Sequence, residues 1–392
     1  MNKVGVAFFN DGKSPSSGIS YLDGLVTQFE SIADLDMSVP WIADLTYKDF
    51  QNAGFGRYSQ FRPEQYLRIG ISVIMRELGI KKNIEGAEIV GQFVDSIVED
   101  MHQMVGADPF EQPYRLHYGM LKSLLPSFYQ DALLNKNVAV AAALENAYQA
   151  NQGSHKSNHA NQAKLHHYTF PRLAHFEYLL NQNFPINDTW KEMEQFKKPL
   201  LTGIKRGIPF DNFQQVHTEL RNLHKDTACI LNVRVKSMED SHIQGFSFGV
   251  EGARSNIRLW APLPEVIELM NYAQVEIIGG FETAAGKLPI RPQIDLTINR
   301  YSYPRGVVAE NIWIGLSEPV RMNGNKYATG LGVYMRAYDR LLCGKLAQAF
   351  AKSKFKLGGF GTGGVKVWAR SQDKPKIDSI AARFGAMPDL KG

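Results

Sequence analysis

The chain has 392 residues and a formal net charge of +5, with 44% hydrophobic and 21% charged residues. These values are ordinary for a globular protein and argue against wholesale disorder, and the length favours one large elaborated domain or two domains. No apolar run approaches the ~20 residues of a membrane span, the start lacks a secretory signal, and Cys229 and Cys343 are too few for a disulfide framework. We therefore expect a cytoplasmic protein with no membrane partner.

The first 62 residues combine a strand with an aromatic and basic segment. The apolar run from Val4 to Phe9 predicts a short buried strand. Further on, glycines and two arginines, Arg57 and Arg62, interleave with aromatic residues, which are Tyr47, Phe50, Phe55, Tyr58 and Phe61. Such a segment can stack on bases and pair with phosphates, so both arginines are possible nucleic-acid contacts. Core packing of the aromatic residues is an equal alternative.

Residues 63–150 change to helical periodicity and carry almost no strand signal, which predicts a helical module. Residues 151–172 form a polar arm without periodicity, in which Lys156, Lys164 and Arg172 are possible nucleic-acid contacts. A linker without any role is an equal alternative. The arm also contains four histidines, which are His155, His159, His166 and His167. Their spacing is irregular and no carboxylate or cysteine completes a ligand set, so no metal site is predicted.

Residues 173–392 mix strands with helices. A short helix is predicted at 173–180 and another from Pro264 to Met270, since proline suits a first helical turn. A basic turn broken by Gly and Pro, residues 197–209, carries Lys205 and Arg206 as further possible nucleic-acid contacts. Strands are predicted at 229–235, 245–250, 257–260, 275–278, 293–298 and 311–316. We predict an α+β fold, with a β-rich ferredoxin-like core that carries a large helical insertion.

The C-terminal part contains the most distinctive stretch. Apolar residues from Tyr334 to Phe350 recur at helical spacing and predict an amphipathic helix. Five glycines then follow within seven positions, which are Gly358, Gly359, Gly361, Gly363 and Gly364. This density predicts a turn, neither helix nor strand, whose backbone needs positive φ or close approach to a ligand. Residues 365–370 alternate apolar and polar, as a half-buried strand does.

Positive charge is concentrated around these glycines. Between Arg336 and Lys376 ten basic residues face only Asp339 and Asp373, so this segment is +8 and the rest of the chain sums to −3. Such a concentration favours a polyanionic partner, although a solvated helix face followed by a flexible turn is the plain alternative. The residues predicted to bind RNA are Lys352, Lys354, Lys356, Gly358, Gly359, Gly361, Gly363, Lys366 and Arg370.

The run from Gly358 to Val367 resembles the glycine-rich loop of the CRISPR-associated RAMP superfamily. In that superfamily the loop links the last helix of a ferredoxin-like domain to its last strand and lies against RNA. The resemblance implies a non-catalytic backbone subunit of the Cas-five or Cas-seven type, in a type I surveillance ribonucleoprotein for antiviral defence, with a variant type I-F complex as the expected kind. Its partners would be guide RNA, other subunits and target DNA met by the helical module.

Two other functions remain open at this point: a RAMP-like endoribonuclease that processes guide RNA, and a phage or plasmid structural protein that packs nucleic acid. No catalytic motif or nucleotide-binding fingerprint is present, so neither catalytic residues nor a cofactor are predicted. His217 and His224 lie seven residues apart on a predicted helix, where a structural role is favoured over general acid–base catalysis.

Overall fold

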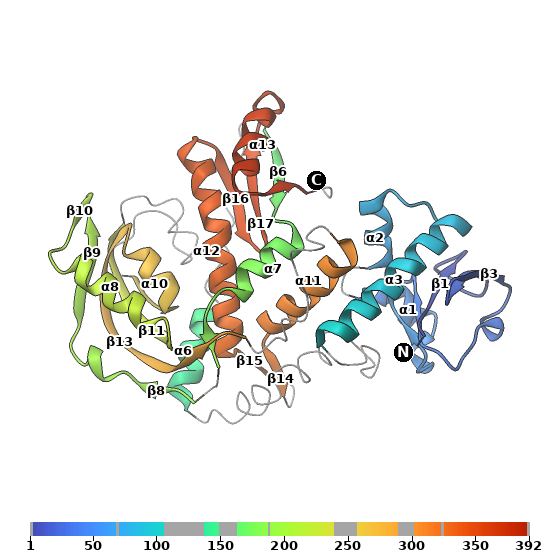
Figure 1. Cartoon of the computed structure of the whole chain (residues 1–392), viewed down its shortest axis with the longest axis horizontal. Helices are drawn as coiled ribbons and strands as arrows, with labels where there is room; N and C mark the ends of the chain where they lie inside the picture. Colours follow the sequence, from blue (N-terminus) through green and yellow to red (C-terminus); the bar gives the residue numbers. More distant parts are fainter. Residues whose placement is uncertain are drawn as a thin grey trace. The chain divides into compact units, whose positions relative to one another are not determined.

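The computed structural model describes residues 3–67, 70–105, 137–148, 163–186, 189–238, 257–288, 302–322 and 325–389. The chain divides into two compact units, one formed by 1–125 with 289–315 and the other by 126–288 with 316–392. Both units combine helices with sheets (Figure 1), so the predicted α+β class is confirmed. Among the described helices none is long and apolar enough to cross a membrane.

The first unit is built on a five-stranded sheet of order β3-β2-β1-β4-β5. Its strands are β1 (Gly5–Phe9), β2 (Gly18–Leu22), β3 (Leu25–Phe29), β4 (Trp41–Ala43) and β5 (Phe61–Arg62). The strand predicted at Val4–Phe9 is therefore β1, and its central place explains why all five of its residues are buried. The strands β1, β2 and β3 are antiparallel neighbours, whereas β4 runs parallel to both β1 and β5.

Aromatic rings form the core on one side of this sheet. The ring of Phe55 lies 5.3 Å from that of Phe9 and 4.9 Å from that of Phe61, both edge to face. Phe50, at the end of the first turn of α1 (Tyr47–Asn52), joins them. Core packing is therefore the correct alternative for Phe50, Phe55 and Phe61, while Tyr47 and Tyr58 are exposed.

Three helices complete the first unit: α2 (Ile71–Leu78), α3 (Ile84–Val105) and α11 (Tyr303–Ser317). Gly91 lets α3 approach the sheet, because a β-carbon there would lie 2.0 Å from the Tyr21 ring. The helix α11 replaces the strand predicted at 311–316. That prediction is wrong because the segment is buried on nearly all sides, so its apolar run lacks the periodicity that separates a helix from a strand.

The second unit contains a larger sheet whose main strands have the order β10-β9-β13-β11-β12. These strands are β9 (Leu200–Lys205), β10 (Ile208–Pro209), β11 (Thr227–Met238), β12 (Ile257–Pro262) and β13 (Ala273–Gly286), and the short β7 (Phe184–Pro185) and β8 (Lys191–Glu192) also pair with β13. Residues 197–209, predicted as a broken turn, include the β9–β10 hairpin instead, because the turn Arg206–Gly207 adopts φ of 53° and 76° and lets the chain pair back on itself.

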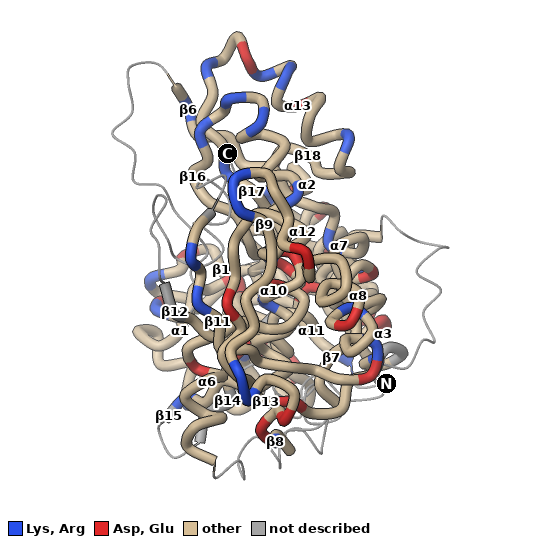
Figure 2. The backbone as a smooth tube through the Cα atoms, turned by 90° about the vertical axis from the view of Figure 1, so that its left-hand side faces the viewer, with Lys and Arg blue, Asp and Glu red and all other residues tan. Residues whose placement is uncertain are grey.

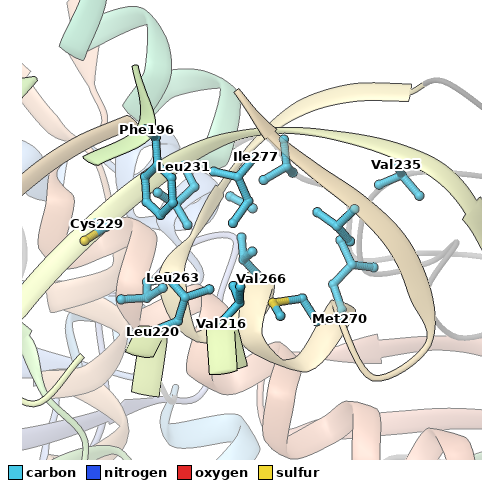
Figure 3. Close-up of a cluster of buried hydrophobic side chains, with 14 of the residues drawn as sticks. Phe196, Val216, Leu220, Cys229, Leu231, Val235, Leu263, Val266, Met270 and Ile277 are labelled. Atoms are coloured by element: carbon cyan, nitrogen blue, oxygen red, sulfur yellow. The ribbon is translucent and has the colours of Figure 1, made fainter. Parts of the chain in front are cut away.

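The helices α8 (Phe213–Leu223) and α10 (Leu263–Leu269) pack on this sheet. Figure 3 shows side chains from both helices meeting those of the sheet, with Val216 and Leu220 on α8 and Val266 on α10. Apart from the short β10, the order β9-α8-β11-β12-α10-β13 along the chain is the β-α-β-β-α-β succession that ferredoxin-like domains also have. In the sheet the four strands have the order β9-β13-β11-β12, so that β13 and β11 are central, whereas ferredoxin-like domains have their first and third strands in the centre.

A four-stranded antiparallel sheet of order β16-β17-β6-β18 completes the second unit. Its strands are β6 (Lys164–Thr169), β16 (Lys356–Gly361), β17 (Gly364–Ala369) and β18 (Met387–Pro388). One face packs on α12 (Gly330–Lys352) and α13 (Lys374–Arg383), through buried residues such as Phe350, Val365, Val367 and Ile377. The polar arm predicted at 151–172 therefore ends in a sheet strand, β6, and in the start of α7 (Arg172–Leu180).

Helix α12 connects most parts of the second unit. The hydroxyl of Tyr334 accepts from Cys229 N (2.7 Å) and donates to Cys229 O (2.9 Å) on β11. The guanidinium of Arg340 makes two 2.7 Å hydrogen bonds to the carboxylate of Glu265 on α10, and both side chains are buried. Arg336 stacks 3.9 Å above the ring of Tyr148, the last residue of α6 (Val138–Tyr148).

The two units divide the chain differently from the predicted domains 1–62, 63–150, 151–172 and 173–392. Of the helices in 63–150, α2 and α3 belong to the first unit and α6 to the second. The physical reason is that each apolar helix face is covered by a different sheet: α3 packs on β1 and β2, whereas α6 packs on β11 and β12. Residues 106–136 and 149–162, including Lys156 and the arm's predicted loop, lie outside the described residues, as do the strands predicted at 245–250 and 293–298.

The remaining short elements connect these parts. They are β14 (Val320–Met322), β15 (Asn325–Tyr327), η1 (Ile32–Asp34), η2 (Phe55–Arg57), η3 (Glu64–Leu67), η4 (Glu194–Phe196) and η5 (Ser371–Asp373).

Candidate nucleic-acid interface

The glycine-rich run forms a β-hairpin, the β16–β17 hairpin. Three of its glycines, Gly358, Gly359 and Gly361, belong to strand β16, and the two-residue turn Thr362–Gly363 leads into β17. Both turn residues have positive φ, 54° and 70°, as a type I′ hairpin turn requires. The positive φ expected of the glycines is present at Gly359 (142°) and Gly361 (123°) as well.

The prediction that this segment cannot be a strand is therefore wrong. Pairing with β17 satisfies the backbone groups of β16 that face that strand, and a register shift between Leu357 and Gly359 accommodates the extra residue. The segment also differs from the loop that the RAMP resemblance implied, because a strand stands between the last residue of α12 and the turn.

A buried carboxylate holds the hairpin turn. Asp339 on α12 accepts hydrogen bonds from the backbone N–H of Thr362 and of Gly363 (2.7 Å) and lies 2.9 Å from His175 Nε2 on α7. Burial alone would raise the pKa of the Asp339 carboxyl, but the bonds from His175 and from the two N–H groups lower it below its ordinary value. The turn is thereby fixed to α12 and α7.

The face of this sheet opposite α12 and α13 is the open face. Cross-strand neighbours place Lys356, Trp368 and Leu165 in one row, and Gly359, Lys366 and His167 in the next. Lys356, Lys366 and Leu165 are exposed, and His167 pairs with Asp389 at 2.7 Å. The face thus carries two exposed lysines beside the partly buried indole of Trp368 and the exposed Leu165.

Basic residues surround the open face. From Lys352 to Lys376 the chain carries seven Lys or Arg and one Asp, a net charge of +6, and all seven basic side chains are exposed. They are Lys352, Lys354, Lys356, Lys366, Arg370, Lys374 and Lys376. Lys374 pairs with Asp378 (2.7 Å), whereas Lys356, Lys366 and Arg370 form no ion pair with any described residue. Figure 2 shows Lys and Arg along β16, β17 and α13 with few acidic positions between them.

The other predicted contacts are dispersed. Lys164 is exposed at the start of β6, in this same sheet, and Arg172 is partly buried at the start of α7. Lys205 and Arg206 are exposed at the tip of the β9–β10 hairpin. Arg57 is exposed in η2 of the first unit.

Arg62 is not available as a contact. Its side chain is buried, with 7% exposure, because the guanidinium donates to the carbonyl oxygens of Ser59 and Phe61 and lies 5.6 Å from the Tyr66 ring. Its role is to close the turn before β5.

Sequence reasoning missed Trp368, Leu165 and His167 as part of the interface. The alternation of Lys366-Val367-Trp368 already placed Lys366 and Trp368 on one face of a strand. The pairing of this strand with residues 164–169, some two hundred positions earlier, carries no local signal.

His217 and His224 make packing and hydrogen-bond contacts within the second unit. His224 Nε2 lies 2.7 Å from the Tyr338 hydroxyl, and His217 packs its ring 5.4 Å from that of Phe213. The described part of the chain contains no group of three His, Cys, Asp or Glu side chains that could hold a metal ion.

Comparison with known proteins gave solved structures only. Neither a protein-family model nor a curated protein matches the chain. Phi29 DNA polymerase with primer-template DNA and incoming nucleotide matches at a TM-score of 0.45 and 10% identity, over 94% of this chain and 80% of the polymerase. An orthorhombic crystal form of the same polymerase gives 0.47 and 10% over the same shares, and its complex with single-stranded DNA gives 0.36 and 13% over 76% and 50%. With TM-scores below 0.5, these likenesses do not establish a shared fold.

These neighbours nevertheless contradict two predictions. None of the structures named above is a CRISPR protein, so the prediction of a guide-RNA-binding subunit of a surveillance complex is overturned. The prediction that the protein is not an enzyme is contradicted by the same finding, because a DNA polymerase is an enzyme.

Proposed function

We propose that this chain binds nucleic acid through the open face of the β16-β17-β6-β18 sheet and the basic residues around it. The observation that carries the proposal is the group of seven exposed Lys and Arg side chains from Lys352 to Lys376, six of which form no ion pair with any described residue. Cationic side chains without a counter-charge attract phosphate and release the counterions condensed on it.

The shape of the site supports a phosphate backbone as the ligand. Lys356 and Lys366 stand on the same flat face, and Lys354 and Arg370 lie at the end of the sheet away from the turn. Two charges on strands and two at the strand ends can track an extended chain of phosphates, and such contacts confer affinity without selecting a sequence. The similarity to a polymerase that binds DNA is compatible with this class of partner but adds no weight to it.

The test is the salt dependence of binding. A variant with Lys354, Lys356, Lys366 and Arg370 all changed to Gln should bind a fluorescent 20-nucleotide DNA more weakly, measured by anisotropy from 50 to 300 mM KCl. Each phosphate contact contributes roughly 0.7 to 0.9 to the slope of log K against log salt, so the slope should flatten by about 3.

A matched variant controls for net charge. Lys13, Lys48, Lys81 and Lys225 are exposed and lie outside this sheet, so changing them to Gln removes the same charge from other places. We expect this control to keep the wild-type slope. A folded quadruple variant of the sheet that retains wild-type affinity and slope would overturn the proposal.

A further inference from the structure

The open face carries two neighbouring apolar side chains beside its lysines, Trp368 and Leu165. Trp368 on β17 has Lys356 as its neighbour on β16 and Leu165 as its neighbour on β6, and directly opposite residues have Cβ atoms about 4.5–5.5 Å apart. Leu165 ends this row, because β18 pairs only with Tyr168 and Thr169 of β6, and its side chain is 42% exposed.

Gly358 leaves room for these two side chains. A β-carbon at Gly358 would lie 2.6 Å from Leu165 Cδ1 and 3.2 Å from Trp368 Nε1, so both side chains lean across β16 where it has no side chain of its own. The indole and the leucine together therefore form a low platform on the open face. The described helices that pack on this sheet, α12 and α13, lie on its other face and do not cover the platform.

The platform and the lysines together match the chemistry of one ligand. An unpaired nucleotide offers a flat aromatic base to the indole and a phosphate to a lysine. Lys356 lies beside Trp368 on β16, and Lys366 lies two residues before Trp368 on β17. In a duplex the bases are stacked and paired inside the helix, so only phosphates reach a flat protein surface. If Trp368 and Leu165 were only a structural cross-strand pair, they would still lie side by side. The chain would then bind single-stranded and double-stranded nucleic acid equally well.

We infer that the open face takes unpaired nucleotides, with a base stacked on the platform of Trp368 and Leu165 and its neighbouring phosphates on Lys356 and Lys366. This inference rests on the proposed function and adds to it a preference for single-stranded over double-stranded nucleic acid. Phosphate contacts alone would not supply that preference.

The experiment compares dT20 with a 20-base-pair duplex as ligands of the full chain. Base stacking contributes roughly 1–3 kcal/mol per base, so Trp368→Ala should weaken dT20 binding by about 5- to 150-fold while duplex binding changes less than twofold. Trp368→Phe retains an aromatic face and should restore most of the dT20 affinity. The exposed aromatic Tyr47 lies outside this sheet, so Tyr47→Ala is the matched control and should change neither affinity.

A fluorescence readout covers the case in which Trp368→Ala does not fold. Binding of dT20 should quench the tryptophan emission of the wild-type chain, and Trp368→Phe should lose most of that quench. Equal dT20 and duplex affinities, or a folded Trp368→Ala variant with wild-type dT20 affinity, would overturn the inference while the salt slope still supports the proposed function. Absence of any binding by the wild-type chain would instead remove the proposed function itself.

Discussion

At the scale of single residues, His224 shows how burial sets a protonation state. Tyr338 donates its hydroxyl proton to Asn183 O (2.6 Å), so the 2.7 Å contact requires that His224 Nε2–H donate to the Tyr338 oxygen. The other ring nitrogen, Nδ1, is buried and has no hydrogen-bond partner among the described residues. Burial first, and then the charge of Lys287, lower the pKa of His224 from 6.5 to about 4.

This shift predicts a pH-dependent stability. As the pH falls from 6.5 to about 4, the unfolded chain takes up a proton at His224 that the folded chain does not, so the free energy of unfolding decreases. The loss is about 1.4 kcal/mol per pH unit and roughly 3 kcal/mol in all, and below this window it stops growing. Urea unfolding at pH 7, 5.5 and 4 should show a flatter profile for His224→Gln, which can still donate to Tyr338. Identical profiles for the two proteins would contradict the prediction.

At the scale of elements, the contact of α12 with the β16–β17 hairpin depends on Asp339. Asp339→Asn leaves one oxygen to accept from Thr362 N, Gly363 N and His175, so one buried donor loses its partner. The expected cost is about 1–3 kcal/mol of the free energy of unfolding. Amide hydrogen exchange should become faster in the hairpin and stay unchanged in β11.

The exposed Asp23 supplies the control for this prediction. It pairs with Lys3 on the surface, with both side chains 59% exposed, so Asp23→Asn should change the free energy of unfolding little and leave hairpin exchange unchanged. Hairpin exchange in Asp339→Asn at the wild-type rate would show that the turn is held by strand pairing alone.

The elements also show how far sequence reasoning reaches. Strands with a clear two-residue alternation or a bounded apolar run, such as β1, β11 and β17, and the long helix α12 were predicted near their observed positions. The glycine-rich strand β16 could not be predicted in this way, because its strand conformation comes from pairing with β17 and glycine itself does not favour an extended state. The helix α11 differs from the strand predicted at 311–316, because a fully buried segment has no polar face to reveal its period.

Only the part of the candidate site that depends on local sequence could be predicted. The concentration of lysines around the glycines is a local property of the sequence, and the structure places those lysines on the surface as expected. The second half of the open face, Leu165 and His167, comes from β6, which pairs with β17 across a long sequence separation. Arg62 is the opposite case: the sequence predicted a nucleic-acid contact, but its guanidinium is buried because it donates to nearby backbone carbonyl oxygens.

At the scale of the whole molecule, the first unit is assembled from two segments far apart in the sequence. Its helix α11 follows most of the second unit in the chain and contacts α2 and α3, through Tyr303 to Glu77 (2.7 Å) and Arg305 to Asp100 (3.1 Å). The first unit therefore cannot complete its core until the chain has been made beyond residue 303.

This assembly predicts a stability effect confined to one unit. Burial raises the pKa of the Asp100 carboxyl and the charge of Arg305 opposes that rise, so Arg305→Ala leaves a half-buried carboxylate without compensation. We expect a loss of about 1–2 kcal/mol, discounted from a fully buried pair because both side chains keep some contact with water. Hydrogen exchange along a urea series should then show β1 and β4 losing protection at lower urea, while β11 and β13 keep the wild-type midpoint.

Arg383→Ala, an exposed change at the end of α13, is the control and should move neither midpoint. A simultaneous shift of all four strands in Arg305→Ala would mean that the two units unfold as one cooperative block, contrary to this prediction.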